Sequence, residues 1–210
     1  MSSLTSHPPI AASDAPALED RRTLRASLAF AGVILVGFGF LYSLGGAALG
    51  RVLFPHQATG SLVVVDGKVR GSELVAQPFG DARYFQPRPS VANYDPMAAA
   101  GSNLARSNPD LRKRIDELTQ AVAQREGIAP AQVPGELVTQ SGGGLDPHLS
   151  PAGARVQVAR VAKARGLDVA TVERLVAQHT RDRQLGVLGA SRVNVLALNL
   201  ALDAQPSGTH

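Results

Sequence analysis

The chain has 210 residues, with 21 Lys and Arg against 17 Asp and Glu, so its formal net charge is +4. It contains no cysteine, which excludes disulfides, thiolate metal sites and thiol nucleophiles. It has no tryptophan and only 4% aromatic residues, which argues against a nucleic-acid platform built on base stacking.

The first 50 residues predict a tail and one membrane span. Residues 1–25 are rich in Ser, Ala and Pro without periodicity, so we expect a disordered tail. Residues 26–50 hold no formal charge and lie between Arg25 and Arg51. As a helix they would be about 37 Å long, enough to cross a hydrocarbon core of about 30 Å. A buried helix of a soluble protein and a cleaved signal peptide are alternatives, but the run is long for both.

The charges beside the span predict its orientation. Arg21, Arg22 and Arg25 precede it, while Arg51 alone follows it closely. The positive-inside rule then places the amino terminus in the cytoplasm. Residues 51–210 are accordingly expected to form one extracytoplasmic domain.

Small residues within the span repeat at helical spacing. Gly39, Ser43 and Ala47 recur every fourth position, and Gly46 and Gly50 form a GxxxG pair. Such stripes let helices approach closely in lipid, which predicts a partner helix. Small residues are also common in membrane helices in general, so both interpretations stay open.

A β-hairpin is predicted directly after the span and a short connector. Residues 62–65 and 68–71 flank Asp66 and Gly67, the dipeptide best suited to a two-residue turn. Residues 72–75 could continue the sheet. Beyond them, five prolines across 77–109 predict a long irregular loop, and four of the five aromatic residues that follow the span lie in it, which argues against disorder.

Helices are expected in the remainder, with a short strand at 137–139. One begins at an Asn108 cap and stops at Gly127, a second runs from Ser150 to Arg165, and a third follows an Asp168 cap. Residues 193–202 alternate like a strand but also fit a helix, which we favour, with Ser191 as its cap. The expected fold class is α/β in the α+β sense: one transmembrane helix followed by a mixed domain with a small sheet and about four helices.

The search for catalytic motifs is mostly negative. No phosphate loop, HExxH, GxSxG or helix-opening GxGxxG occurs, and the histidines are too dispersed to predict a metal site. The one cluster of interest is 141–150, where a serine, Asp146 and His148 lie close in sequence. A membrane-tethered extracytoplasmic hydrolase using Asp146 and His148 is the alternative function, although turn formation and helix capping explain the same residues. Asx and Ser turns likewise account for Asn93, Ser102 and Asn103.

Six stretches together resemble a known family. In chain order they are DGKVRGSELVAQPF, YFQPRPS, GSNLARSNPDL, SGGGLDPHLSP, QVARVAKARG and RVNVLALNLALD. With the single amino-terminal span, they are similar to the C subunits of the Kdp potassium-transporting P-type ATPases of bacteria. The resemblance implies an accessory, non-catalytic subunit of an inner-membrane complex with a channel-like potassium-binding subunit and an ATP-hydrolysing P-type subunit. The chain itself lacks the DKTG phosphorylation motif of such pumps.

The resemblance also implies a chaperone-like role that raises the ATP affinity of the catalytic subunit. The predicted topology makes any such effect indirect, because an extracytoplasmic domain cannot reach cytoplasmic ATP. No cofactor of its own is expected, and ATP would be met through the catalytic subunit; if contact were direct, Gln157 and Arg160 are the matching polar residues. The candidates for partner contact are Gly39, Ser43, Ala47, Tyr84, Phe85, Arg88, Asn93, Ser102, Asn103, Asp146 and His148.

Overall fold

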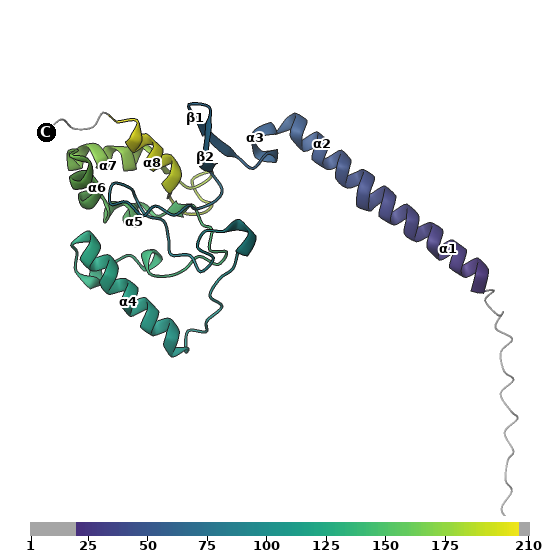
Figure 1. Cartoon of the computed structure of the whole chain (residues 1–210), viewed down its shortest axis with the longest axis horizontal. Helices are drawn as coiled ribbons and strands as arrows, with labels where there is room; N and C mark the ends of the chain where they lie inside the picture. Colours follow the sequence, from purple (N-terminus) through teal and green to yellow (C-terminus); the bar gives the residue numbers. More distant parts are fainter. Residues whose placement is uncertain (1–19, 206–210) are drawn as a thin grey trace, which may run out of the picture. The chain divides into compact units, whose positions relative to one another are not determined.

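The computed structural model describes residues 20–205, which fall into two compact units divided after Ala58 (Figure 1). The first, called here the helical unit, is almost entirely one long helix. The second, called here the folded domain, contains the sheets and the remaining helices. The two are described separately. The expected disordered tail lies mostly outside the described residues.

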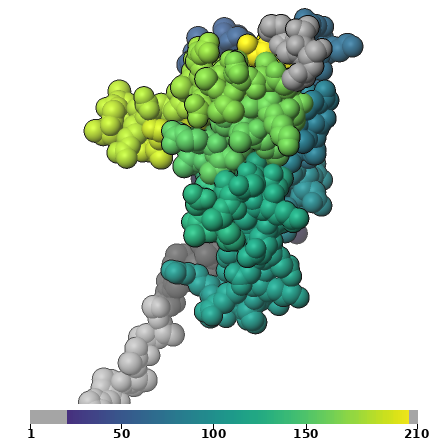
Figure 2. Space-filling view, turned by 90° about the vertical axis from the view of Figure 1, so that its left-hand side faces the viewer, coloured from purple at the N-terminus to yellow at the C-terminus, as the bar shows by residue number. Residues whose placement is uncertain are grey.

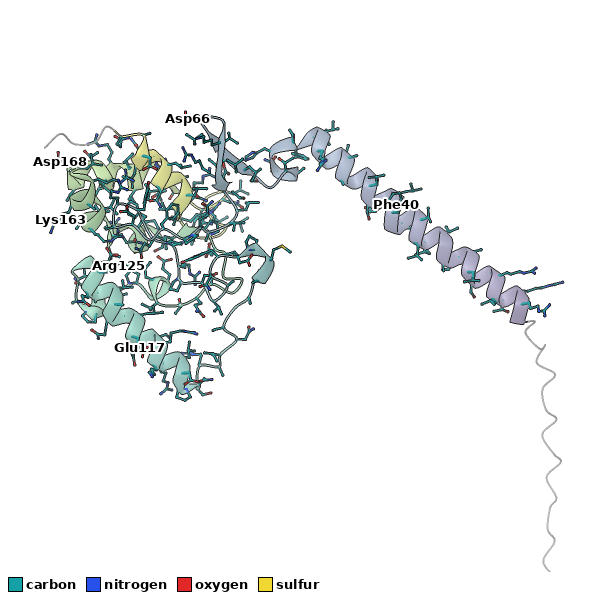
Figure 3. All side chains as sticks on the ribbon, viewed as in Figure 1. Phe40, Asp66, Glu117, Arg125, Lys163 and Asp168 are labelled. Carbon is teal, nitrogen blue, oxygen red and sulfur yellow. The ribbon has the colours of Figure 1, made fainter. Side chains whose placement is uncertain are left out.

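The helical unit is one continuous apolar helix followed by a short one. Its parts are α1 (Asp20–Val33), a π-helical stretch (Ile34–Tyr42), α2 (Ser43–Leu53) and then α3 (Pro55–Ala58). Residues 21–53 form the one helix within 20–205 that is long and apolar enough to span a membrane, and an 18-residue window within it has a mean hydropathy of 2.0. Its large side chains, Phe40 among them, project outward and are exposed (Figure 3). The helix extends past the expected 26–50 at both ends, and the sequence did not predict its π-helical middle.

The folded domain begins with the predicted hairpin. Strands β1 (Leu62–Val65) and β2 (Lys68–Ser72) pair antiparallel around Asp66 and Gly67, whose φ angles are 52° and 72°. Positive φ at both positions is what a two-residue hairpin turn requires, so this prediction is confirmed. The suggested continuation of the sheet beyond Ser72 is wrong, because the Ser72 hydroxyl accepts the N–H of Leu74 at 3.1 Å and turns the chain.

The predicted helix starts and stops largely hold. Asn108 caps α4 (Pro109–Glu126) by accepting the N–H of Asp110 at 2.8 Å, and Gly127 ends it with φ 68°. The single helix expected from Ser150 to Arg165 is instead two, with a break at Val156 and Gln157. The later helices are α5 (Pro151–Arg155), α6 (Val158–Arg165), α7 (Val169–Gln178) and α8 (Val195–Asp203).

A second sheet escaped prediction because its strands have only two or three residues. Its order is β3 (His148–Leu149), β5 (Arg192–Asn194), β4 (Thr180–Arg181), and both pairings are antiparallel. The helix favoured at 193–202 is confirmed from Val195 onward as α8, whereas residues 193 and 194 belong to β5, and Ser191 is not the cap. Asn194 is, since its side chain accepts the N–H of Ala197 at 3.0 Å.

The core lies where one face of this sheet meets the helices and the long loop. The strand expected at 137–139 is wrong, because residues Gly135–Leu137 form a 3-10 turn that buries Leu137. Two further 3-10 turns span Pro96–Ala98 and Pro130–Gln132. The expected mixed α+β class with one long apolar helix is confirmed. Large, fully buried apolar side chains come from the loop, the sheet and three helices: Phe85, Leu149, Val161, Val172, Val193, Leu198 and Leu202.

Candidate functional site

The small-residue stripe lies on the surface of the helical unit. Gly39, Ser43 and Ala47 are all exposed on the helix surface. A Cβ built on Gly39 meets only the carbonyl oxygen of Ile34, at 3.8 Å, and one built on Gly46 meets nothing within 4 Å. Within the helical unit, the surface that another helix could approach closely is therefore uncovered.

In the folded domain, two buried amide side chains hold the long loop by its backbone. Asn199 accepts the N–H of Phe85 at 2.8 Å and donates to its C=O at 2.9 Å. Gln157 does the same to Gln86, at 2.8 and 3.1 Å, and also donates to the C=O of Gly153. Both amides are almost fully buried, so they supply backbone partners where no strand does. Sequence reasoning did not assign Asn199 this role, although a single amide within an otherwise apolar helix could have indicated it.

Arg160 completes this amide clamp from the next turn of α6. Its guanidinium donates to the C=O of Tyr84 at 3.0 Å and to the C=O of Ala82, and also to Gln157 Oε1 at 2.8 Å. Its Nε donates to the buried carboxylate of Glu126 at 2.9 Å. Gln157 and Arg160 were the candidates only if nucleotide contact were direct, and their polar atoms are thus engaged inside the domain.

Two of the predicted partner contacts, Tyr84 and Phe85, belong to the loop segment whose backbone the amide clamp binds. Phe85 is 0% exposed, so its side chain has no surface to offer a partner, and it serves the core instead. The Tyr84 hydroxyl donates to Asp203 at 3.2 Å, while the guanidinium of Arg165 lies 4.8 Å from its ring centroid. Arg165 also pairs with Asp203 at 2.7 Å, which fixes Tyr84 between them.

Gly101 meets the glycine-rich segment 142–144, which is distant from it in sequence. A Cβ on Gly101 would lie 2.6 Å from the carbonyl oxygen of Gly142, a contact that no Cβ tolerates. The candidates Asn93 and Asn103 are exposed and adopt positive φ, 49° and 50°. Ser102 lies between Gly101 and Asn103 and is half-buried.

Arg88, Asp146 and His148 form a second polar cluster. Asp146 accepts from Arg88 Nη1 at 3.0 Å and from the backbone N–H of His148 at 3.0 Å, and the His148 ring lies 3.6 Å away. The His148 side chain and backbone, together with Arg88, lower the pKa of Asp146 to about 2 against partial burial. Arg88, from the loop, is thereby tied to the turn that leads into β3.

This cluster lacks the relay that a hydrolase needs. The Ser150 hydroxyl donates to Glu136 at 2.6 Å, and the Ser141 hydroxyl accepts the N–H of Asp146 at 3.4 Å. Neither is bonded to the His148 ring among the described contacts, whereas nucleophilic catalysis by serine requires that bond. The arrangement instead matches turn formation and helix capping. Residues 20–205 also hold no group of histidine and carboxylate side chains that could bind a metal ion.

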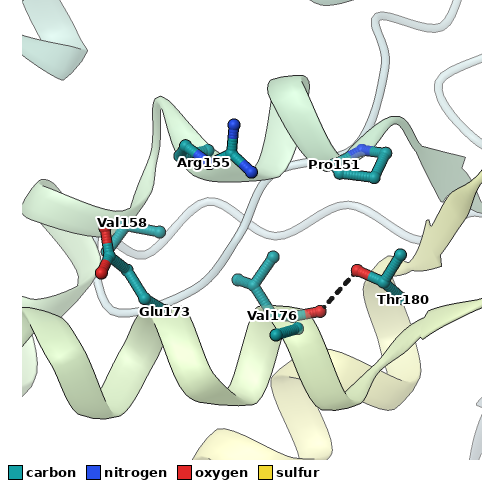
Figure 4. Close-up of a pocket in the computed structure, with 7 residues that line it drawn as sticks. Pro151, Arg155, Val158, Glu173, Val176 and Thr180 are labelled. Carbon is teal, nitrogen blue, oxygen red and sulfur yellow. Dashed lines mark hydrogen bonds between the residues drawn. The ribbon is translucent and has the colours of Figure 1, made fainter.

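A pocket of about 400 Å³ lies between α5 and α7 (Figure 4). Arg155 and Glu173 line it together with apolar side chains, and the one hydroxyl, of Thr180, is spent on the C=O of Val176 at 2.7 Å. That hydroxyl is therefore not hydrogen-bonded to a general base that could activate it as a nucleophile. The lining of this pocket therefore does not indicate a catalytic site.

Comparison with known proteins identifies what this architecture belongs to. The family model described as "K+-transporting ATPase, c chain" matches residues 24–204, which include both the apolar helix and the folded domain. Potassium-transporting ATPase KdpC subunits from Xanthomonas oryzae and Xanthomonas campestris are 61% and 59% identical over 191 residues, covering 91% of each chain. The subunit from Shewanella putrefaciens is 51% identical over 180 residues, covering 86% of this chain and 88% of its own. The chain therefore belongs to the KdpC family of potassium-transporting ATPase subunits.

Proposed function

We propose that this chain is an accessory, non-catalytic subunit that holds a potassium-transporting ATPase complex together. Its partners are a channel-like potassium-binding subunit and a P-type subunit that hydrolyses ATP. The observation that carries the proposal is the long apolar helix, whose small-residue stripe is exposed within the helical unit. The folded domain supports it, since the polar groups of its amide clamp and of the Asp146 cluster are engaged internally rather than arranged around a substrate.

The folded domain is assigned to the extracytoplasmic side, with the amino terminus in the cytoplasm. The support is the flanking charge, because Arg21, Arg22 and Arg25 precede the apolar stretch and Arg51 follows it. The absence of native cysteine makes a clean test available. A cysteine at exposed Ser107 should react with a membrane-impermeant maleimide on spheroplasts, and one near the amino terminus should react only after lysis. The reverse pattern would contradict this topology.

The effect of this subunit on ATP affinity is assigned to its contacts with the catalytic subunit. Gln157 and Arg160 support that assignment, because their hydrogen-bonding atoms hold the backbone of the long loop. A nucleotide could reach them only by displacing that loop from the core. We therefore assign both residues a structural role. Any gain in the ATP affinity of the catalytic subunit is then transmitted through the docked helix.

The docking role of the helix is tested by enlarging the stripe. Gly39→Leu and Ser43→Leu place a bulky side chain where close helix approach is proposed, so each should lower copurification of the other subunits in mild detergent. Gly45→Leu is the matched control, because it lies two residues from Ser43, on nearly the opposite face of α2, where a Cβ also meets nothing within 4 Å. Equal recovery for stripe and control variants would refute docking through the stripe.

A further inference from the structure

The outer face of the second sheet carries an arrangement that the proposed function has not used. Leu149 and Val193 point into the core, 1% and 0% exposed. Since neighbouring residues of a strand face opposite sides, His148, Arg192 and Asn194 lie on the other face. The strand register pairs His148 with Asn194, and Arg192 with Arg181.

This face is the floor of a pocket of about 330 Å³. His179 and Gln178 enter it from the end of α7, and Ala197 from α8, with Leu74 and Glu73 at the exit from the hairpin. The charged and titratable groups that line it are therefore two arginines and two histidines against the single carboxylate of Glu73. His179 already uses Nδ1 on the C=O of Leu175 at 2.9 Å, so its other ring nitrogen is the one left for a ligand.

Like several other arginines of the domain, the two have no carboxylate partner among the described residues, but they lie directly opposite each other in the sheet. Arg83, Arg125 and Arg165 each pair with a carboxylate, whereas within residues 20–205 neither Arg181 nor Arg192 makes a side-chain hydrogen bond or ion pair. Like charges directly opposite each other on a sheet repel and destabilise the pairing. A bound anion relieves that repulsion, and guanidinium groups suit the oxygens of a carboxylate.

The loop that joins the two arginines exposes apolar side chains on an ordered turn. Residues 182–191 stand out from the domain as the yellow-green lobe in Figure 2. Gln184 and Leu188 exchange backbone hydrogen bonds of 2.9 Å in both directions, so the turn between them is ordered. Leu185, Val187 and Leu188 are nevertheless 90%, 74% and 56% exposed. Ordered apolar side chains held in water are typical of a protein contact surface.

We propose that Arg181 and Arg192 bind the carboxylate of an acidic side chain from another subunit of the complex, against which the apolar 182–191 loop packs. The inference rests on the proposed function, since it names a contact that holds the subunit in its complex. A concave pocket receives a single protruding side chain, whereas the headgroup surface of a bilayer is flat. Glu73 at the rim also opposes a doubly charged phosphate more than a carboxylate.

The test removes both arginines from the tagged full chain. Arg181→Ala with Arg192→Ala should lower recovery of the other subunits by about tenfold in mild detergent at low salt, and should remove most of the salt dependence of that recovery. A control that deletes two exposed arginines outside the pocket, Arg112→Ala with Arg174→Ala, should leave recovery unchanged. The melting temperature of the pocket variant should equal or exceed that of the wild type, because a repulsive pair has been removed.

Three results would overturn the inference. One is wild-type recovery with wild-type salt dependence in the pocket variant, and another is lost recovery together with a lowered melting temperature, which indicates a structural role. The third is a difference in partner recovery between the wild type and the pocket variant that appears in phosphatidylglycerol nanodiscs but not in phosphatidylcholine nanodiscs, which identifies a lipid as the ligand. If the wild-type chain itself recovers no partner, the proposed function fails instead.

Discussion

Truncating Gln157 to alanine should destabilise the folded domain severely. The amide accepts from the N–H of Gln86 and from Arg160, and it donates to the C=O groups of Gln86 and Gly153. Its loss leaves both backbone groups of Gln86 without these partners, and each buried polar group left unpaired costs about 1–3 kcal/mol. With the cavity added, we expect a loss of about 3–5 kcal/mol, a large part of the roughly 5–15 kcal/mol that stabilises a typical domain.

Calorimetry of the full chain in mild detergent measures this effect. For a domain of this size about 1 kcal/mol shifts the melting temperature by roughly 2–4 °C, so Gln157→Ala should lower it by about 10 °C. Gln124→Ala is the matched control, because Gln124 is exposed on α4 and has no side-chain hydrogen bond within residues 20–205. A melting temperature within about 1 °C of the control would refute the amide clamp. Lower ATP affinity in the complex at unchanged stability would restore the nucleotide-contact hypothesis.

Three further predictions concern the glycine contact and the Asp146 cluster. Gly101→Ala should destabilise the domain by about 1–3 kcal/mol, since its Cβ would lie 2.6 Å from the Gly142 oxygen, whereas Gly80→Ala, with open space around it, should change the free energy of unfolding by less than about 0.5 kcal/mol. The folded-state pKa of Asp146, about 2, lies below the unfolded value, so the stabilisation from its carboxylate is present above about pH 4 and is lost as the pH falls toward 2. In Asp146→Asn, the free energy of unfolding should therefore fall by about 1 kcal/mol less than in the wild type over this pH range, after allowance for solvent exposure. His148→Ala should leave potassium-stimulated ATP hydrolysis of a normally assembled complex intact, and its abolition would revive the hydrolase alternative.

Local signals predicted the fold wherever the determining residues are neighbours. The hairpin followed from Asp66 and Gly67, whose positive φ is a property of the dipeptide itself. The boundaries of α4 followed from the Asn108 cap and from Gly127, which ends the helix in a left-handed conformation. The apolar helix followed from the absence of charge over 26–50.

Long-range contacts decided what the sequence could not reveal. The break between α5 and α6 places Gln157 where its amide can hold Gln86, 71 residues earlier. Strands of two or three residues are too short for a period-two pattern, so the pairing of Arg181 with Arg192 was not foreseen. Phe85 was expected at an interface because it lies in a loop, yet tertiary packing buries it completely.

The central claim is that this chain assembles with a potassium-transporting ATPase without supplying its chemistry. The most direct measurement is affinity purification of the tagged full chain from native membranes in mild detergent, with identification of every copurifying chain and assay of potassium-stimulated ATP hydrolysis. We expect stoichiometric recovery of a channel-like subunit and a P-type catalytic subunit in an active complex. Recovery of the chain alone, or of ATP hydrolysis by the chain alone, would contradict the claim.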